Sequence, residues 1–164
     1  MLFRSGTLHF CLDENVGASN ASLSTSKLQL DYNGNLGLGV TPSAWGSGKC
    51  AIENIGYALW SGSASNFLLG NNVYQNSGGS YIYKNTAAAT MYYQNNGSNI
   101  WYNAPSGTAG TAISFTQAMT LDASGNLVLG TTSALSGGKF SIQTDLTTTN
   151  GIVLKDTEIG RAHV

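Results

Sequence analysis

The stretch Leu30-Asp31-Tyr32-Asn33-Gly34-Asn35-Leu36-Gly37-Leu38-Gly39 occurs a second time in this chain, as Leu121-Asp122-Ala123-Ser124-Gly125-Asn126-Leu127-Val128-Leu129-Gly130. The two copies start 91 residues apart. In each copy, leucines lie on both sides of a polar centre, which is typical of two β-strands joined by a tight turn. The sequence therefore predicts two strand-turn-strand modules, over residues 27–54 and 118–144.

The polar centre of each module has the residues that a tight turn needs. An Asp at the start accepts hydrogen bonds from nearby backbone N–H groups, and Gly adopts a positive φ without steric cost. A calcium loop is the alternative, but it needs Gly sixth and a bidentate Glu twelfth. Here Gly is fourth, and the twelfth residue is Pro42 or Ser133. We therefore predict structural turns at Asp31, Asn33, Gly34 and Asn35, and at Asp122, Ser124, Gly125 and Asn126.

Both ends of the chain match a translated sequencing reagent. Residues 1–5 and 158–164 are what a widely used short-read sequencing adapter would encode, in opposite orientations. Segments of this kind do not belong to a natural fold, so we expect residues 6–157 to be the natural part of a metagenomic fragment. Within it we predict a leading strand and linker over 6–26, a Tyr/Asn/Gly-rich β meander over 55–117 and the start of another β segment over 145–157.

The composition favours an all-β chain with an uncharged polar surface. Only 9% of the residues are charged, against roughly 25% in an ordinary domain. Solvent-facing helices usually draw on Glu, Lys and Arg, so we expect little or no helix. A hydrophobic content of 41% argues against disorder. The predicted fold is all-β, with short antiparallel hairpins and meanders.

Charge and cysteine usage bear on possible partners. Nucleic-acid binding needs clustered cations, whereas residues 6–157 hold five lysines, no arginine and seven carboxylates. No run of about 20 apolar residues suggests membrane insertion. Cys11 and Cys50 lack the closely spaced partners of a metal site, so we expect no metal or other cofactor. We predict two small buried apolar residues there, with a disulfide as the alternative.

The region between the modules carries a weaker repeat. Tyr74-Gln75-Asn76 precedes Gly79-Ser80-Tyr81-Ile82, just as Tyr93-Gln94-Asn95 precedes Gly97-Ser98-Asn99-Ile100. Each unit is long enough for two short strands and their turns, which predicts an antiparallel meander. Alternating Phe115, Gln117 and Met119 then predict the strand that enters the second module.

No constellation of residues predicts an enzyme. A hydrolytic triad needs a histidine between a nucleophile and a carboxylate, and His9 is the only histidine in residues 6–157. A glycosidase needs two nearby carboxylates, but residues 57–119 contain none. Gly37-Leu38-Gly39 lacks the third glycine and the helix of a phosphate loop. We therefore expect a structural or binding protein.

The aromatic residues of the middle region have the chemistry of a saccharide surface. Aromatic rings stack on sugar C–H groups, and neighbouring Asn and Gln amides can hydrogen-bond to hydroxyls. The alternative is that about half of the rings fill a core, because side chains alternate along a strand. The candidate saccharide contacts are Tyr81, Tyr83, Tyr93, Trp101 and Tyr102, with Tyr92 beside them.

Short hairpins with few charges cannot bury enough apolar surface alone. Packing their leucines around a threefold axis would bury that surface, so we expect a homotrimer.

The phrases Met119 to Ser133 and Leu28 to Pro42 resemble the repeated stretch of tailed-bacteriophage tail fibre and tailspike proteins. There the stretch often precedes an endosialidase-type intramolecular chaperone, a domain that this sequence does not contain. The resemblance implies a trimeric β-fibre of the virion tail, assembled in the host cytoplasm. Its implied partners are other tail proteins and a host cell-surface polysaccharide or protein receptor. A trimeric bacterial surface adhesin and a non-catalytic part of a tailspike depolymerase are the alternatives.

Overall fold

The computed structural model describes residues 2–4, 6–11, 26–133 and 140–142, and all the regular structure among them is β. The predicted all-β fold is confirmed. Of the predicted leading strand and linker over 6–26, residues 12–25 lie outside the described part of the chain, and so does the predicted β segment over 145–157. The strands are β1 (Leu2–Arg4), β2 (Thr7–Cys11), β3 (Ser26–Leu30), β4 (Leu36–Leu38), β5 (Cys50–Glu53), β6 (Tyr57–Ser61), β7 (Asn66–Asn71), β8 (Val73–Gln75), β9 (Tyr81–Tyr83), β10 (Ala87–Asn95), β11 (Ser98–Gly107), β12 (Thr116–Leu121), β13 (Leu127–Leu129) and β14 (Phe140–Ile142).

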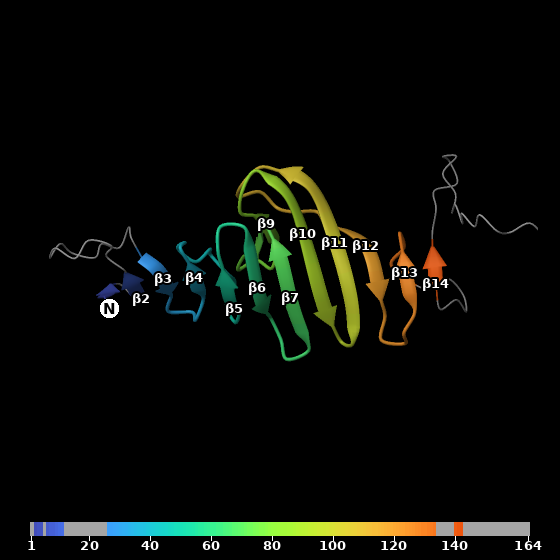
Figure 1. Cartoon of the computed structure of the whole chain (residues 1–164), viewed down its shortest axis with the longest axis horizontal. Helices are drawn as coiled ribbons and strands as arrows, with labels where there is room; N and C mark the ends of the chain where they lie inside the picture. The colour runs from blue at the N-terminus through green and yellow to red at the C-terminus, as the bar shows by residue number, and fades with distance from the viewer. Residues whose placement is uncertain (1, 5, 12–25, 134–139, 143–164) are drawn as a thin grey trace, which may run out of the picture.

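Twelve strands form one sheet in which the strand order follows the chain, and β8 and β9 form a separate two-stranded sheet. The strands stand side by side across the long axis of the molecule (Figure 1). Neighbours are antiparallel except β4 with β5 and β13 with β14, which are parallel. The prediction of antiparallel pairing is wrong at these two places. Between β4 and β5, the connection over residues 39–49 returns the chain to the edge of the sheet at which β4 begins, so that β5 runs in the same direction as β4.

The turns of the two modules have the same hydrogen bonds. Asp31 Oδ1 accepts from the backbone N–H groups of Asn33 and Asn35, at 2.9 and 2.8 Å. Its Oδ2 accepts from Asn35 Nδ2 at 2.9 Å. The same three bonds, at 2.9, 2.8 and 2.8 Å, link Asp122 with Ser124 and Asn126. Both carboxylate oxygens therefore serve the turn in each copy, and the predicted structural turns are confirmed.

Each turn also contains a glycine with a left-handed backbone. Gly34 has a φ of 86° and Gly125 has a φ of 77°. A side chain is strained in this region of φ, which explains why the fourth position of both copies is glycine.

The weaker repeat forms two hairpins with one register. Tyr74 pairs with Ile82 in β8–β9, and Tyr93 pairs with Ile100 in β10–β11. The predicted strands and turns are confirmed, but the two units lie in different sheets. The second unit continues the long sheet, whereas the first forms a second layer.

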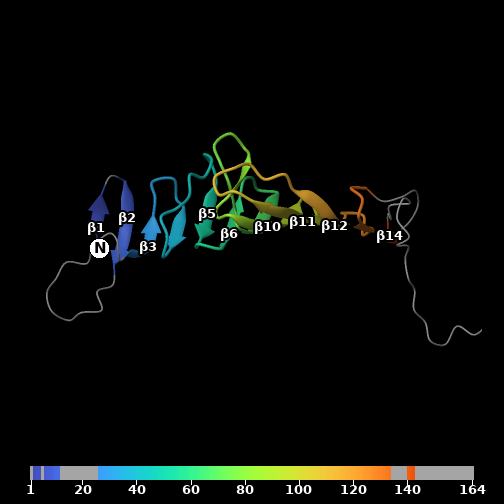
Figure 2. The ribbon, with the colours of Figure 1, turned by 90° about the horizontal axis from the view of Figure 1, so that it is seen from above.

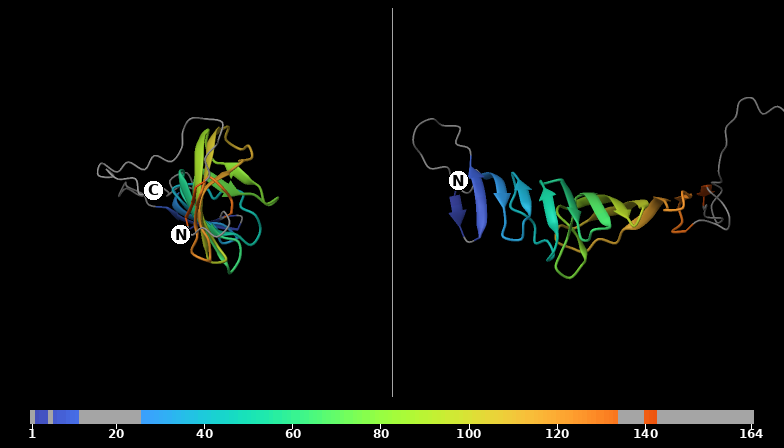
Figure 3. Two further views of the ribbon diagram at one scale, coloured as in Figure 1. Left: turned by 90° about the vertical axis from the view of Figure 1, so that its right-hand side faces the viewer. Right: turned by 90° about the horizontal axis from the view of Figure 1, so that it is seen from below.

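The core lies between one face of the long sheet and this second layer. Small residues such as Ala51, Ala58 and Gly70 face it, so that large rings can pack closely. A Cβ on Gly70 would lie 2.3 Å from Val73 Cγ1. Views from above and below show the layer on one side of the sheet only (Figure 2 and Figure 3). We call this side the covered face and the opposite side the open face. The core comprises Trp45, Ala51, Ala58, Trp60, Leu68, Val73, Tyr83, Ala89, Met91, Ala104 and Ile113.

A β-bulge interrupts the strand that enters the second module. Trp101 pairs with Met119, but Tyr102 pairs with Gln117, so one extra residue lies between the two partners on β12. The predicted alternation that put Gln117 and Met119 on one face is therefore wrong. The bulge turns Gln117 to the covered face and keeps Met119 on the open face.

Candidate functional site

One line of apolar cross-strand partners runs along the open face from β2 to β13. Each member lies opposite the next on the neighbouring strand, and directly opposite residues share a face of the sheet. We call this line the apolar ladder. Its ten members are Leu8, Leu30, Leu36, Ile52, Leu59, Leu69, Tyr92, Trp101, Met119 and Leu129.

No member of the apolar ladder is buried. Leu30 and Ile52 keep 38% of their surface exposed, and Leu69 keeps 44%. Phe67 and Leu121 beside the ladder are exposed to the same degree. Large contiguous apolar patches on soluble proteins usually mark interaction surfaces. The open face is therefore a candidate contact surface.

On the covered face, a line of cross-strand partners that begins at Gln29 differs in composition from the apolar ladder. Gln29, Gly37 and Glu53 are successive cross-strand partners, and all three are buried. Further along, Met91 pairs with Tyr102. This line therefore begins with buried polar and small residues, whereas the apolar ladder on the opposite side of the sheet is open.

The structure divides the predicted saccharide contacts between these two faces. Tyr92 and Trp101 lie on the open face, with ring centroids 5.0 Å apart. Tyr93 and Tyr102 lie on the covered face, where Tyr81 approaches them from β9. Tyr83 is 5% exposed and its hydroxyl donates to the Pro105 carbonyl at 2.6 Å. Tyr83 is thus a core residue whose ring offers little surface to a ligand.

On the covered face, Tyr81, Tyr93, Tyr102 and Phe115 form a cluster that we call the tyrosine platform. Phe115 contacts two of these rings, with centroids 5.6 Å from Tyr81 and 6.0 Å from Tyr102. Burial raises the pKa of Tyr81 to about 12, and repulsion from Tyr93 and Tyr102 adds to this effect. Burial also raises the pKa of Tyr102, and repulsion from Tyr93 adds to this effect. Tyr81 and Tyr102 therefore keep neutral hydroxyl groups at physiological pH.

The open face contains a cleft of about 350 Å³, lined partly by Tyr57, Leu69, Tyr92 and Trp101. The hydroxyl of Tyr92 donates to Asn99 Oδ1 and accepts from Gln94 Nε2. The ring of Tyr92 is thereby held beside Trp101. The cleft is continuous with the apolar ladder, because three of these residues belong to both.

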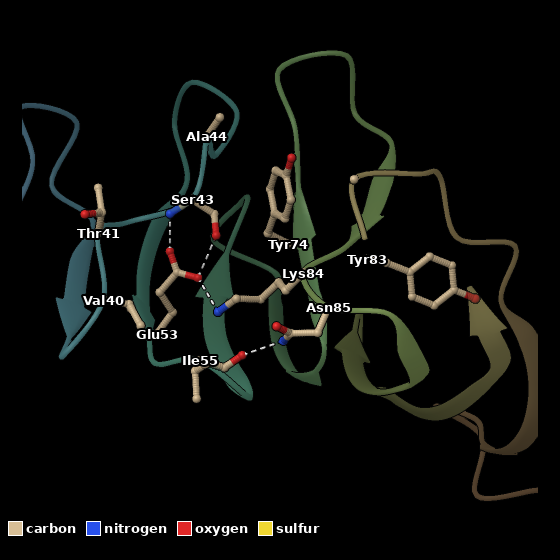
Figure 4. Close-up of a pocket in the computed structure, with 11 residues that line it drawn as sticks. Val40, Thr41, Ser43, Ala44, Glu53, Ile55, Tyr74, Tyr83, Lys84 and Asn85 are labelled. Atoms are coloured by element: carbon tan, nitrogen blue, oxygen red, sulfur yellow. Dashed lines mark hydrogen bonds and ion pairs between the residues drawn. The ribbon is translucent and has the colours of Figure 1, made fainter. Parts of the chain in front are cut away.

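A buried charge pair lies on the covered side, at the end of β5. Glu53 is fully buried, and its Oε2 lies 2.5 Å from Lys84 Nζ. The Glu53 carboxylate also accepts from the Ser43 backbone and hydroxyl groups and from Trp45 Nε1. Figure 4 shows Ser43 and Lys84 approaching this carboxylate from two sides. The Glu53 carboxylate thus accepts hydrogen bonds from four donors. These bonds hold the loop at Ser43 and the second layer at Lys84 against β5, which is a structural role.

A cleft of about 340 Å³ lies beside this pair, lined partly by Thr41, Tyr74 and Asn85. Sequence reasoning missed the pair because no short motif contains it. A signal was nevertheless present, because Glu53 and Lys84 are the only charged residues between Lys49 and Asp122. Two lone opposite charges in a long uncharged region are good candidates for partners.

Cys50 is exposed on the open face, so the prediction that it is buried is wrong. It lies at the end of β5, where the sheet has no cover. The Cys11 side chain lies outside the described part of the structure. Among the described residues, no three His, Cys, Asp or Glu side chains are grouped to hold a metal ion.

No helix among the described residues is long and apolar enough to cross a membrane. Comparison with protein-family models, curated proteins and solved structures finds no match for this chain. The candidate surfaces are therefore interpreted from their own residues.

Proposed function

We propose that this chain is a segment of a homotrimeric bacteriophage tail fibre that helps to attach the virion to a host cell-surface receptor. The observation that carries the proposal is the apolar ladder, which crosses ten consecutive strands of the sheet without a charged member. A sheet that is open along its whole apolar face needs a partner of the same length. A second and third copy of the chain supply one.

The energetics favour such an association. Full burial of a Leu-sized side chain is worth roughly 1.5–3 kcal/mol. Ladder residues such as Leu69, which is 44% exposed, still have part of this gain to realise. Summed over ten positions in each copy, the free energy gained by burying these side chains can offset the cost of association, which is roughly 4–15 kcal/mol.

Three copies suit the shape of this face better than two. The module strands β4 and β13 are three residues long and place only two leucines each on it. The apolar strip is therefore narrow there, as expected for a sheet that shares an axis with two others. The resemblance of both modules to the repeats of tail fibres also supports a trimer.

This arrangement decides which aromatic residues can meet a receptor. Tyr92 and Trp101 belong to the apolar ladder and face the trimer axis. The covered face and its second layer point outward. Any receptor contact made by the middle region then comes from the outward side.

The mass of the full chain in solution tests the trimer. We expect the mass of three copies by light scattering coupled to size-exclusion chromatography. Leu69→Lys places a charge in the middle of the ladder and should give monomers or insoluble protein. Ser77→Lys is the matched control, because Ser77 is exposed at the β8–β9 turn, and it should leave the trimer intact. A monomeric or dimeric wild-type chain would contradict the proposal.

The reading frame beyond residue 157 of the parent gene tests the viral assignment. An intramolecular chaperone domain there would support a tail fibre. A membrane anchor would instead identify a bacterial surface adhesin and would refute the assignment.

A further inference from the structure

The covered face carries an aromatic cluster next to the second layer. Tyr93 and Tyr102 are diagonal neighbours on this face, because Tyr93 pairs with Ile100 and Tyr102 pairs with Met91. Phe115 lies between Tyr81 and Tyr102, edge-on to Tyr81 at a centroid distance of 5.6 Å and tilted against Tyr102 at 6.0 Å. All four rings of the tyrosine platform are partly exposed. Rings from three separate segments therefore form one surface that solvent reaches.

The hydroxyl groups of this platform have no protein partner in the part of the chain that the structure describes. Within the described residues, Tyr81, Tyr93 and Tyr102 make no hydrogen bond through their side chains, whereas Tyr83 and Tyr92 do. Half-buried tyrosines usually direct their hydroxyl to a partner or to water. Three such hydroxyls lie near one another here, so they form a group of donors and acceptors that is open to a ligand.

Most of the platform comes from an uncharged segment of the chain. Residues 85–121 contain no Asp, Glu, Lys, Arg or His, and this segment provides three of the four rings. A sulfated or sialylated glycan, or a charged peptide, would find no counter-ion in that segment. An uncharged sugar needs none, because its C–H face stacks on aromatic rings and its hydroxyls bond to phenol groups.

We propose that the tyrosine platform is a receptor-contact site for an uncharged saccharide. This inference rests on the proposed function in one respect, namely that the open face is turned inward and leaves the platform outside. It excludes Trp101 and Tyr92 from the site, and it excludes Tyr83 because that ring is in the core.

Conservative substitutions test this inference without disturbing the packing. Tyr81→Phe, Tyr93→Phe and Tyr102→Phe each remove one hydroxyl and keep the ring. The probes are glucose, galactose, mannose and N-acetylglucosamine, measured by saturation-transfer NMR on the full chain. We expect at least one of them to bind. Each substitution should weaken that binding about 2- to 10-fold, as loss of one hydrogen bond does, and the triple variant should abolish it.

Two controls separate the platform from other aromatic surfaces. Tyr92→Phe removes a hydroxyl from the open face and should leave binding unchanged. N-acetylneuraminic acid is the charged comparator and should not bind. Binding of the charged sugar alone, or equal binding by wild type and the triple variant, would overturn the inference.

The mass of each sample separates this inference from the trimer proposal. A trimeric wild-type chain that binds no probe refutes the platform alone. A monomeric chain whose binding is lost in the triple variant refutes the trimer and supports the platform.

Discussion

Glu53 and Lys84 stand 31 residues apart in the chain and form a buried ion pair, with Oε2 and Nζ separated by 2.5 Å. The side chain of Lys84 is only 8% exposed and that of Glu53 is not exposed at all. Lys84 also donates to the Asn54 carbonyl. The pair thus joins the second layer to the end of β5, and Ser43 ties the preceding loop to the same carboxylate.

Removing one partner of this pair should destabilise the fold strongly. Lys84→Met leaves the Glu53 carboxylate buried without its counter-ion, which typically costs about 3–5 kcal/mol. Urea unfolding at fixed protein concentration measures the loss. The double variant Glu53→Gln with Lys84→Met should recover part of it, because no buried charge then remains. A change of less than about 0.5 kcal/mol in Lys84→Met, the size of an ordinary surface substitution, would contradict a structural role.

The two module turns should respond differently to the same substitution. Asn35 is buried, and its Oδ1 also accepts the Ala51 N–H at 3.0 Å, whereas Asn126 is partly exposed. Asn35→Ala should therefore cost about 1–3 kcal/mol, because a buried donor on β5 loses its partner. Asn126→Ala should cost less. Urea midpoints of the two variants measure the difference, and equal losses would show that the Ala51 bond adds nothing.

These turns could be predicted from sequence because their contacts are local. The bonds of Asp31 and Asp122 reach no further than four residues along the chain. The apolar ladder could not be predicted in this way. Alternation within a strand predicts which residues share a face, but only pairing between distant segments places Leu59, Leu69 and Tyr92 in one line.

The candidate site could be predicted only in outline. The aromatic composition indicated a surface, and alternation puts Trp101 and Tyr102 on opposite faces, but only the pairing of β11 with its neighbours shows that Tyr102 is the one on the covered face. Tyr83 is buried because β8 and β9 form a second layer. The repeat predicted instead that these strands belong to the same meander as the rest of the middle region. Tertiary packing decided both.

The stability of the protein should fall at alkaline pH through Tyr81. Its pKa is raised from 10.0 to about 12 in the folded state. The folded chain therefore holds this proton more tightly than the unfolded chain. The resulting stability is fully present below pH 10 and is lost as the pH rises through about 12.

Tyr81→Phe should make the urea midpoint less dependent on pH in that window. Absorbance of the phenolate form in the wild-type protein should show a tyrosine that titrates near pH 12 and that the variant lacks. A variant with the same alkaline loss as wild type would show that another group is responsible.

The reactivity of Cys50 should report on assembly. In the Cys11→Ser variant, Cys50 is the only thiol, and it lies on the open face. A trimer with this face inward should protect it from a thiol reagent. Addition of Leu69→Lys should restore rapid modification. Equally fast reaction in both proteins would place Cys50, and with it this end of the open face, outside the interface.

Because strand order in the long sheet follows the chain, position in the sequence is also distance along the molecule. Each added strand lengthens the sheet by about 4.8 Å, so a hairpin inserted into it adds close to 10 Å. The β8–β9 hairpin instead stands off the sheet and adds no length. Insertion of a hairpin can therefore have two outcomes. The molecule becomes longer if the new strands join the long sheet, and it gains a side layer if they form a separate sheet.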